Sequence, residues 1–156
     1  MIEKEQTSIP TGKVARSAKF VGTGFKIGGN YIKHYSKKIF NPELSRDELN
    51  TDNANDIYSS LSELKGSALK VAQMLSMDKN ILPKAYVDKF SLSQYNAPPL
   101  SGPLIVQTFR KHFGKNPDQI FDKFNLKSTH AASIGQVHEA ELNGKKLAVK
   151  IQYPGV

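Results

Sequence analysis

The sequence contains no cysteine among its 156 residues. This absence excludes disulfide bonds, thiolate metal sites and cysteine nucleophiles. It fits a reducing compartment, and we expect a cytoplasmic protein. The N-terminus lacks the apolar segment of a secretory signal, and no apolar run approaches the ~20 residues that a membrane-spanning helix needs. We therefore expect a chain that is soluble or at most lies peripherally on a membrane.

Acidic residues are scarce relative to basic ones. The chain has 22 lysines and arginines against 14 aspartates and glutamates, which gives a net charge of +8. This excess favours an anionic partner such as nucleotide phosphate, nucleic acid or an acidic lipid surface. No zinc finger, recognition helix or aromatic RNA-binding strand supports nucleic acid, so we expect no nucleic-acid partner. No spaced set of histidines and carboxylates predicts a metal site.

Periodic apolar positions predict helices over most of the first 124 residues. A shorter helix is expected to begin near Ser45, which has capping-box spacing to Glu48. Another is expected to begin at Asn116 and end near Phe124. Gly114 is the expected stop of the helix before it. The four longer helices are expected at 11–39, 54–78, 83–94 and 102–113.

The segment 11–39 has an apolar face and a separate face of lysines. Lys19, Lys26 and Lys33 line the second face at intervals of seven residues. Two interpretations follow. The helix either packs on its own protein with its lysines in water, or rests as a basic amphipathic helix on anionic lipid. The apolar or small positions are Val14, Ala18, Val21, Phe25, Gly28, Ile32, Tyr35 and Ile39.

From about residue 125 the pattern changes to one typical of strands. Asn143-Gly144 is a strong hairpin signal, because both central residues of a type I′ turn need positive φ. The turn joins expected strands at 136–142 and 146–152. In the second strand, alternation places Lys150 on the face opposite its apolar residues. A lysine in the middle of an otherwise good strand indicates a function.

The segment 130–137 can be aligned with the kinase loop pattern G-x-G-x-x-G-x-V. Gly135 and Val137 match the third glycine and the valine, whereas His130 and Ala132 replace the first two glycines. Such a loop lets backbone N–H groups approach phosphates. His130 either caps the loop or contacts a phosphate.

Ala148-Val149-Lys150 has the form of the lysine strand of kinases and follows Val137 at the kinase spacing. In this arrangement Val137 and Ala148 form an apolar surface for the base. Lys150 places a cation on the α and β phosphates. Loop, turn, alternation and lysine occur in the order that a nucleotide-binding lobe requires.

Two stretches resemble the UbiB/ADCK family of atypical kinases. THAASIGQVHEAELNGKKLAVKIQYPGV is similar to its alanine-rich loop and lysine strand, and LKGSALKVAQMLSM to its K-x-G-Q helix. The resemblance implies an α+β fold with an N-terminal helical extension and the first strands of a protein-kinase-like N-lobe, left incomplete. The resemblance covers roughly residues 55–156. Together with the periodicity of the first helix, it divides the chain into a basic glycine-rich helix at 1–44, a helical extension with a K-x-A-Q motif at 45–124 and the truncated start of the N-lobe at 125–156.

The resemblance also implies roles for individual residues. Lys150 is the implied catalytic residue. Lys70 and Gln73 match the motif lysine and glutamine, lie one turn apart and are implied to regulate the site from one cleft. Ala72 departs from the family, which has glycine at this position. The implied nucleotide-binding residues are Ala131, Ala132, Ser133, Ile134, Gly135, Val137, Ala148 and Lys150.

By this resemblance the chain is the N-terminal part of an atypical ATP-binding kinase or ATPase that supports quinone or lipid biosynthesis at membranes. ATP or ADP with Mg²⁺ is the implied cofactor. Kinase chemistry also needs a glutamate that holds the lysine and side chains that bind Mg²⁺. We expect these beyond Val156, and no ATP turnover by the chain alone. The alternative is a non-catalytic basic helical module that docks on an anionic membrane or partner protein.

Overall fold

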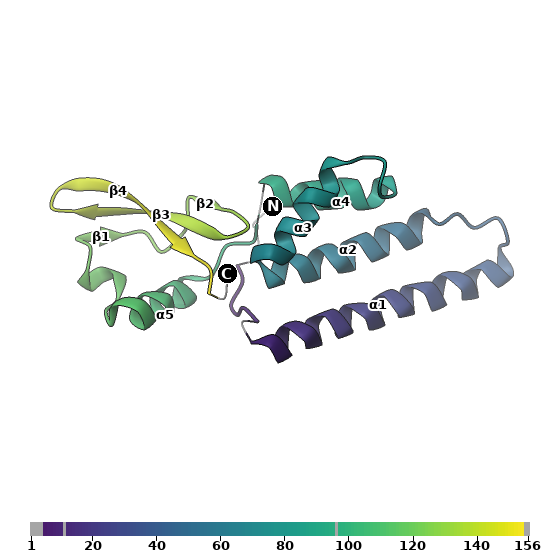
Figure 1. Cartoon of the computed structure of the whole chain (residues 1–156), viewed down its shortest axis with the longest axis horizontal. Coiled ribbons are helices and arrows are strands. Elements are labelled where there is room, and N and C mark those ends of the chain that lie inside the picture. The colour runs from purple at the N-terminus through teal and green to yellow at the C-terminus, as the bar shows by residue number, and fades with distance from the viewer. Residues whose placement is uncertain (1–4, 11, 96, 155–156) are drawn as a thin grey trace.

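The computed structural model describes residues 5–10, 12–95 and 97–154. The molecule is elongated, with helices α1–α4 at one end and helix α5 and the strands at the other (Figure 1). This arrangement confirms the expected α+β class. The elements are α1 (Lys13–Phe40), α2 (Asp47–Leu64), α3 (Gly66–Met77), α4 (Lys84–Tyr95), α5 (Gly102–Phe113), the 3-10 turn η1 (Pro117–Gln119), β1 (Lys123–Phe124), β2 (His130–Ala131), β3 (Gly135–Leu142) and β4 (Lys145–Gln152).

The observed bounds of α1, α4 and α5 agree with the predicted ranges to within two residues. α5 has the predicted bounds and ends at Gly114, whose φ of 67° is left-handed as the stop signal requires. α1 and α4 differ from prediction by one or two residues. α2 begins at Asp47 and absorbs the short helix that was expected after Ser45.

Two other predicted helices are wrong. The single helix at 54–78 is two helices, because Lys65 adopts a left-handed φ of 54° between α2 and α3. The apolar spacing continues across this break, so periodicity alone did not mark it. The helix expected after Asn116 is only the turn η1, and the chain then enters β1, which pairs with the centre of the sheet.

Each end of the molecule has its own hydrophobic cluster. One joins α2, α3 and α4 and contains Leu61, Leu64, Ala68, Leu69, Ala72, Phe90 and Ala97. The other joins α5 to the sheet and contains Leu100, Ile105, Phe109, Ile151 and Tyr153. α5 therefore shares its core with the strands that follow it.

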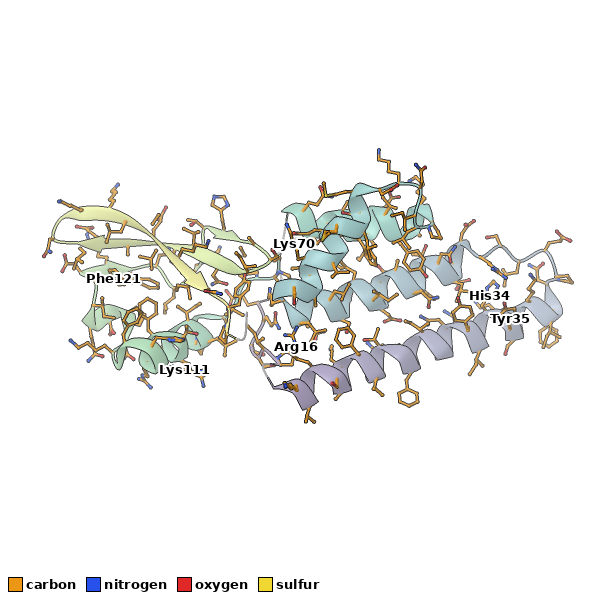
Figure 2. All side chains as sticks on the ribbon, viewed as in Figure 1. Arg16, His34, Tyr35, Lys70, Lys111 and Phe121 are labelled. Atoms are coloured by element: carbon orange, nitrogen blue, oxygen red, sulfur yellow. The ribbon has the colours of Figure 1, made fainter. Side chains whose placement is uncertain are left out.

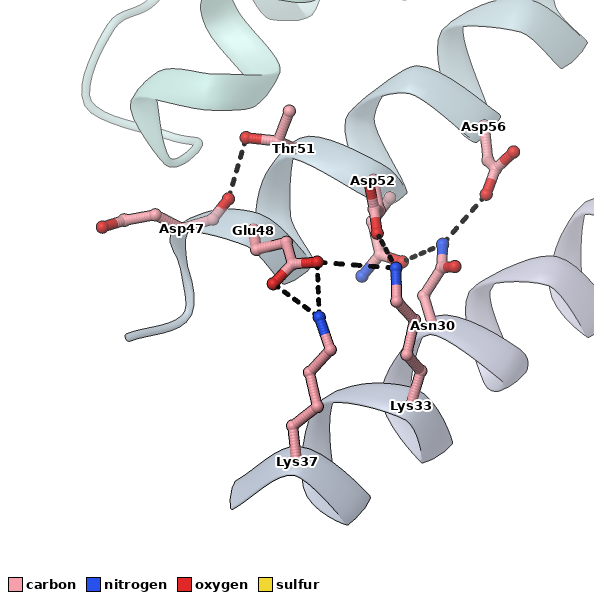
Figure 3. Close-up of polar contacts among 9 residues, drawn as sticks. Asn30, Lys33, Lys37, Asp47, Glu48, Thr51, Asp52 and Asp56 are labelled. Carbon is pink, nitrogen blue, oxygen red and sulfur yellow. Dashed lines mark hydrogen bonds and ion pairs between the residues drawn. The ribbon is translucent and has the colours of Figure 1, made fainter. Parts of the chain in front are cut away.

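α1 packs on α2 through its polar face (Figure 3). Lys33 Nζ lies 3.2 Å from Asp52 Oδ2, and Lys37 Nζ lies 2.7 Å from Glu48 Oε1. Lys19 and Lys26 also pair with acidic residues of α2. The expected packing of α1 on its own protein is confirmed, but the lysine face and not the apolar face is turned toward the partner helix. The lysines face α2, and the apolar face is exposed.

Candidate functional site

β3 is the central strand of an antiparallel sheet. β4 pairs with it over its whole length, while β1 and β2 pair with its two ends. The hairpin turn at Asn143-Gly144 is confirmed, with φ values of 51° and 72°. Both strands of the hairpin begin one residue earlier than predicted. The hairpin sets which residues lie beside one another at the candidate site.

One face of the sheet carries the lysine and the apolar surface expected beneath a base. His130, Val137 and Lys150 lie in one row across β2, β3 and β4. Directly paired residues project on the same face of a sheet, and Ala148, two residues from Lys150, shares that face. Lys150 and Ala148 are exposed, and Val137 is half-buried. We call these four residues the front face.

The opposite face of β3 is buried and polar at two positions that the sequence did not single out. Gln136 Oε1 accepts the N–H of Leu100 at 2.7 Å, and Gln136 Nε2 lies 2.9 Å from His138 Nε2. His138 Nδ1 lies 2.8 Å from the carbonyl oxygen of Asn125. A neutral imidazole with its proton on Nδ1 satisfies every partner in this chain of hydrogen bonds. The network ties β3 to the segments before α5 and after β1.

Protonation of His138 is expected to destabilise the fold. Burial lowers the pKa of His138 below its ordinary value of 6.5, so the unfolded chain takes up the proton first. The neutral His138 side chain contributes fully to the free energy of unfolding above pH 6.5, and this contribution is lost as the pH falls through the lower pKa of the folded state. Urea unfolding between pH 8 and pH 5 should show this loss. His138→Gln should remove it, whereas His130→Gln, at an exposed site, should retain it; equal pH profiles for both variants would contradict this assignment.

The loop between β2 and β3 is a tight bend. The N–H of Ala132 donates to the carbonyl oxygen of Gly135 at 2.9 Å. Within the part of the chain that the structure describes, the N–H groups of Ser133 and Ile134 donate to no protein acceptor. Successive N–H groups at a bend can bind an anion. The loop therefore has the backbone chemistry of a phosphate site.

Two neighbours hold the carbonyl side of this loop. The N–H of Gly66, the first residue of α3, donates to Ser133 O at 2.8 Å. The N–H of Tyr153, just after β4, donates to Ile134 O at 3.0 Å. The loop is thus attached both to the end of the lysine strand and to the helix that carries Lys70.

The two motif residues of α3 have different surroundings. Gln73 Nε2 donates to the carbonyl oxygen of Ser93 in α4 at 2.6 Å. Lys70 is exposed and lies on the part of α3 nearest the sheet (Figure 2). Gln73 is therefore engaged by α4, and the shared cleft expected for Gln73 and Lys70 stays a prediction. Ala72, at the motif glycine position, is fully buried in the helical core.

A cavity of about 570 Å³ lies between α5 and β4. Its lining includes Phe109, Phe121 and Ile151, with Lys111 and Lys150 contributing the charge. None of the loop residues 131–135 lines it. The cavity is therefore separate from the loop, and Lys150 of the front face is also part of the cavity lining.

Neither a metal centre nor a membrane span is found in the described residues. Over 5–10, 12–95 and 97–154, no three histidine, aspartate or glutamate side chains are grouped so that they could hold a metal ion. Over the same ranges, no helix is long and apolar enough to cross a bilayer. Among the nucleotide-binding residues predicted from the sequence, Lys150 alone carries a formal charge.

Comparison with known proteins gives a family for this arrangement. Residues 92–156 match the ABC1 atypical kinase-like domain. The chain is 33% identical to probable serine/threonine-protein kinase abkA of Dictyostelium discoideum, over 99% of this chain and 29% of that protein. It is 34% identical to the mitochondrial atypical kinase COQ8 of Saccharomyces cerevisiae, over 97% of this chain and 31% of that protein.

A third relative agrees with the first two. The mitochondrial atypical kinase coq-8 of Caenorhabditis elegans is 30% identical over 100% of this chain and 22% of its own length. The chain thus spans less than a third of each of these relatives. Fold, loop, lysine strand and relatives lead to one conclusion: the chain belongs to the UbiB/ADCK family of atypical kinase-like proteins, which is also called ABC1.

Proposed function

We propose that this chain supplies the phosphate-binding part of an atypical kinase or ATPase that uses ATP or ADP with Mg²⁺. The row of His130, Val137 and Lys150 carries the proposal, because it ends beside a loop whose N–H groups at Ser133 and Ile134 are unused within the described residues. A cation and two backbone donors on adjacent strands and their connecting loop match the chemistry of a di- or triphosphate.

Each part of the front face has a distinct task in this proposal. The loop N–H groups bind phosphate oxygens, Lys150 neutralises their charge, and Val137 with Ala148 supports the base. Mg²⁺ would neutralise the remaining phosphate charge. We further propose that the substrates belong to quinone or lipid biosynthesis at a membrane, as the family resemblance implies. The cytoplasmic location expected from the sequence stays a prediction, and two relatives carry mitochondrial names.

Nucleotide titration of the full gene product tests the proposal. A fluorescent ADP or ATP analogue is added with and without Mg²⁺, and unlabelled ATP is used as competitor. Saturable binding that ATP displaces supports the phosphate site. Absence of saturable binding under all these conditions would overturn it. The same titration shows which of the two nucleotides is preferred.

A second candidate function comes from the exposed face of α1. Val14, Phe25 and Ile39 are 84%, 79% and 77% exposed on the face opposite α2. With 28 residues, α1 carries this face over roughly 42 Å. Apolar patches of this extent mark protein or membrane interaction sites on soluble domains. We propose that α1 lies on a lipid surface, which would place the front face near a membrane substrate.

Vesicle binding is expected to depend on the apolar face more than on lipid charge. The lysines opposite this face already pair with α2, so anionic and neutral vesicles should bind to a similar extent. Phe25→Ser with Ile32→Ser should weaken co-sedimentation by roughly tenfold or more, since two large apolar side chains that would be buried in the lipid are removed. Met74→Ser, an exposed site on α3, is the matched control. Equal sedimentation of all three proteins would contradict docking through α1, and vesicle-independent self-association would point to a partner helix.

A further inference from the structure

The break between α2 and α3 contains a lysine whose side chain is completely buried. Lys65 is 0% exposed, which is rare for lysine unless its ammonium group is paired. Both Lys65 and Gly66 have positive φ, with values of 54° and 53°. These two residues turn the chain sharply between the helices. The turn brings both the ammonium of Lys65 and the first N–H of α3 against the sheet end of the molecule.

Lys65 contacts two segments that are far apart in the sequence. Its Nζ donates a hydrogen bond to the carbonyl oxygen of Pro98, in the connection between α4 and α5. The same Nζ lies 4.8 Å from the centre of the Tyr153 ring, just beyond β4. Burial raises the pKa of the Tyr153 hydroxyl, so the phenol stays neutral and offers its ring face to the ammonium.

The residues beside these contacts hold the loop at 131–135. Gly66 follows Lys65 directly, and its N–H binds Ser133 O at 2.8 Å. Tyr153 lies under the ammonium, and its N–H binds Ile134 O at 3.0 Å. Lys65 thus joins the two groups that hold successive carbonyl oxygens of the loop.

Holding a carbonyl oxygen also orients an N–H group. The carbonyl of Ser133 and the N–H of Ile134 belong to one planar trans peptide, so they point in opposite directions. The bond from Gly66 to Ser133 O therefore directs the Ile134 N–H away from α3. In the same way, the bond from Tyr153 to Ile134 O orients the N–H of Gly135.

We infer that Lys65 is a positioning residue that fixes the Ile134 N–H for phosphate by holding Gly66 in place, and steadies the same loop by holding Tyr153 against the carbonyl oxygen of Ile134. The role rests on the proposed nucleotide function and deepens it. It also links the loop to α3, because Gly66 begins the helix that carries Lys70. A shift of α3 would then turn the Ile134 N–H and change nucleotide affinity without any contact between α3 and the nucleotide.

Hydrogen exchange of the nucleotide-free full gene product tests the inference directly. Lys65→Met keeps the aliphatic stem and removes the charge. We expect the amides of Gly66 and Tyr153 to exchange about tenfold faster, since a charge-assisted hydrogen bond supports both. The nucleotide KM should rise by about the same factor, with a smaller change in kcat. Lys65→Arg should restore most of the protection and affinity.

Lys89→Met is the matched control for this experiment. Lys89 Nζ lies 5.4 Å from the centre of the Tyr58 ring, which is a similar lysine–tyrosine contact remote from the loop. The control should leave amide exchange at Gly66 and Tyr153 and the nucleotide KM unchanged. If Lys65→Met does not fold, Tyr153→Leu removes the ring face while keeping apolar volume, and it should raise the exchange rate at Gly66.

Two results would overturn the inference. One is wild-type exchange at Gly66 and Tyr153 in a folded Lys65→Met or Tyr153→Leu variant. The other is a failure of Lys65→Arg to restore what Lys65→Met loses. Because exchange is measured without nucleotide, its outcome does not depend on whether the wild-type protein binds ATP. Failure of the proposed function would appear separately, as no saturable binding in the wild type.

Discussion

Replacement of Lys150 by methionine is expected to abolish measurable nucleotide binding. The ammonium sits on the exposed front face, and within the described residues it has no acidic partner that would compete with a phosphate. Two charge-assisted hydrogen bonds to phosphate, at about 1.5–3 kcal/mol each, would be lost. We therefore expect affinity to fall at least about a hundredfold in calorimetric titration of the full gene product. Methionine keeps most of the side-chain volume, so folding should be unaffected.

Lys146→Met is the control that separates position from net charge. Lys146 lies on the same strand and the same face, four residues nearer the hairpin turn, and its register partner is Glu141. Its removal changes the net charge equally but should leave nucleotide affinity within about twofold, because exposed charges at this separation are screened by salt. Equal losses in the two variants would assign the effect to overall charge. Undiminished binding by Lys150→Met would refute the phosphate site.

Replacement of Gly135 by alanine is expected to destabilise the sheet and displace the loop. A methyl group at this position would lie 2.5 Å from the carbonyl oxygen of Ile151 and 3.2 Å from Cα of Gln152. Both are backbone atoms of the paired strand, and Gly135 is directly opposite Gln152 in the register. The clash can be relieved only by separating β3 from β4. We expect a loss of about 1–3 kcal/mol in the free energy of unfolding, measured by chemical denaturation.

Gly28→Ala is expected to raise the free energy of unfolding, in contrast to Gly135→Ala. Gly28 lies within α1, and an added methyl group would have no atom within 4 Å. Alanine is favoured over glycine in a helix by about 0.5–1 kcal/mol, so this variant should be more stable than the wild type. The pair tests whether the glycine of the loop pattern is required by close strand packing. A Gly135→Ala variant as stable as the wild type would show that it is not.

The helix α1 shows how far amphipathic patterning can predict structure. The sequence separated an apolar face from a lysine face, and the structure contains both. Which face packs inward depends on the partner helix, and α2 presents acidic side chains such as Glu48 and Asp52. Several cross-helix pairs therefore form on the polar side, and the apolar side remains exposed. No property of residues 13–40 alone distinguishes this outcome from the reverse.

The local elements of this protein were determined by the sequence itself. Gly114 ends α5, Asn143-Gly144 closes the hairpin, and period-two alternation puts Lys150 on the face shared with Val137. Each of these features depends on the backbone preference of one or two residues or on side-chain direction within one strand. Such signals lie within a few positions of one another, so they can be read without knowing the rest of the fold.

Other features were decided only by tertiary structure. The helix breaks at Lys65 although the apolar spacing in the sequence continues across this position. The Lys65 ammonium is held by Pro98 and Tyr153, which lie 33 and 88 positions further along the chain. Gln73 turns to α4 because a carbonyl of that helix is within reach. The two-residue strands β1 and β2 exist because β3 offers them partners. In each case the energy comes from a contact between distant segments, and no local pattern encodes such a contact.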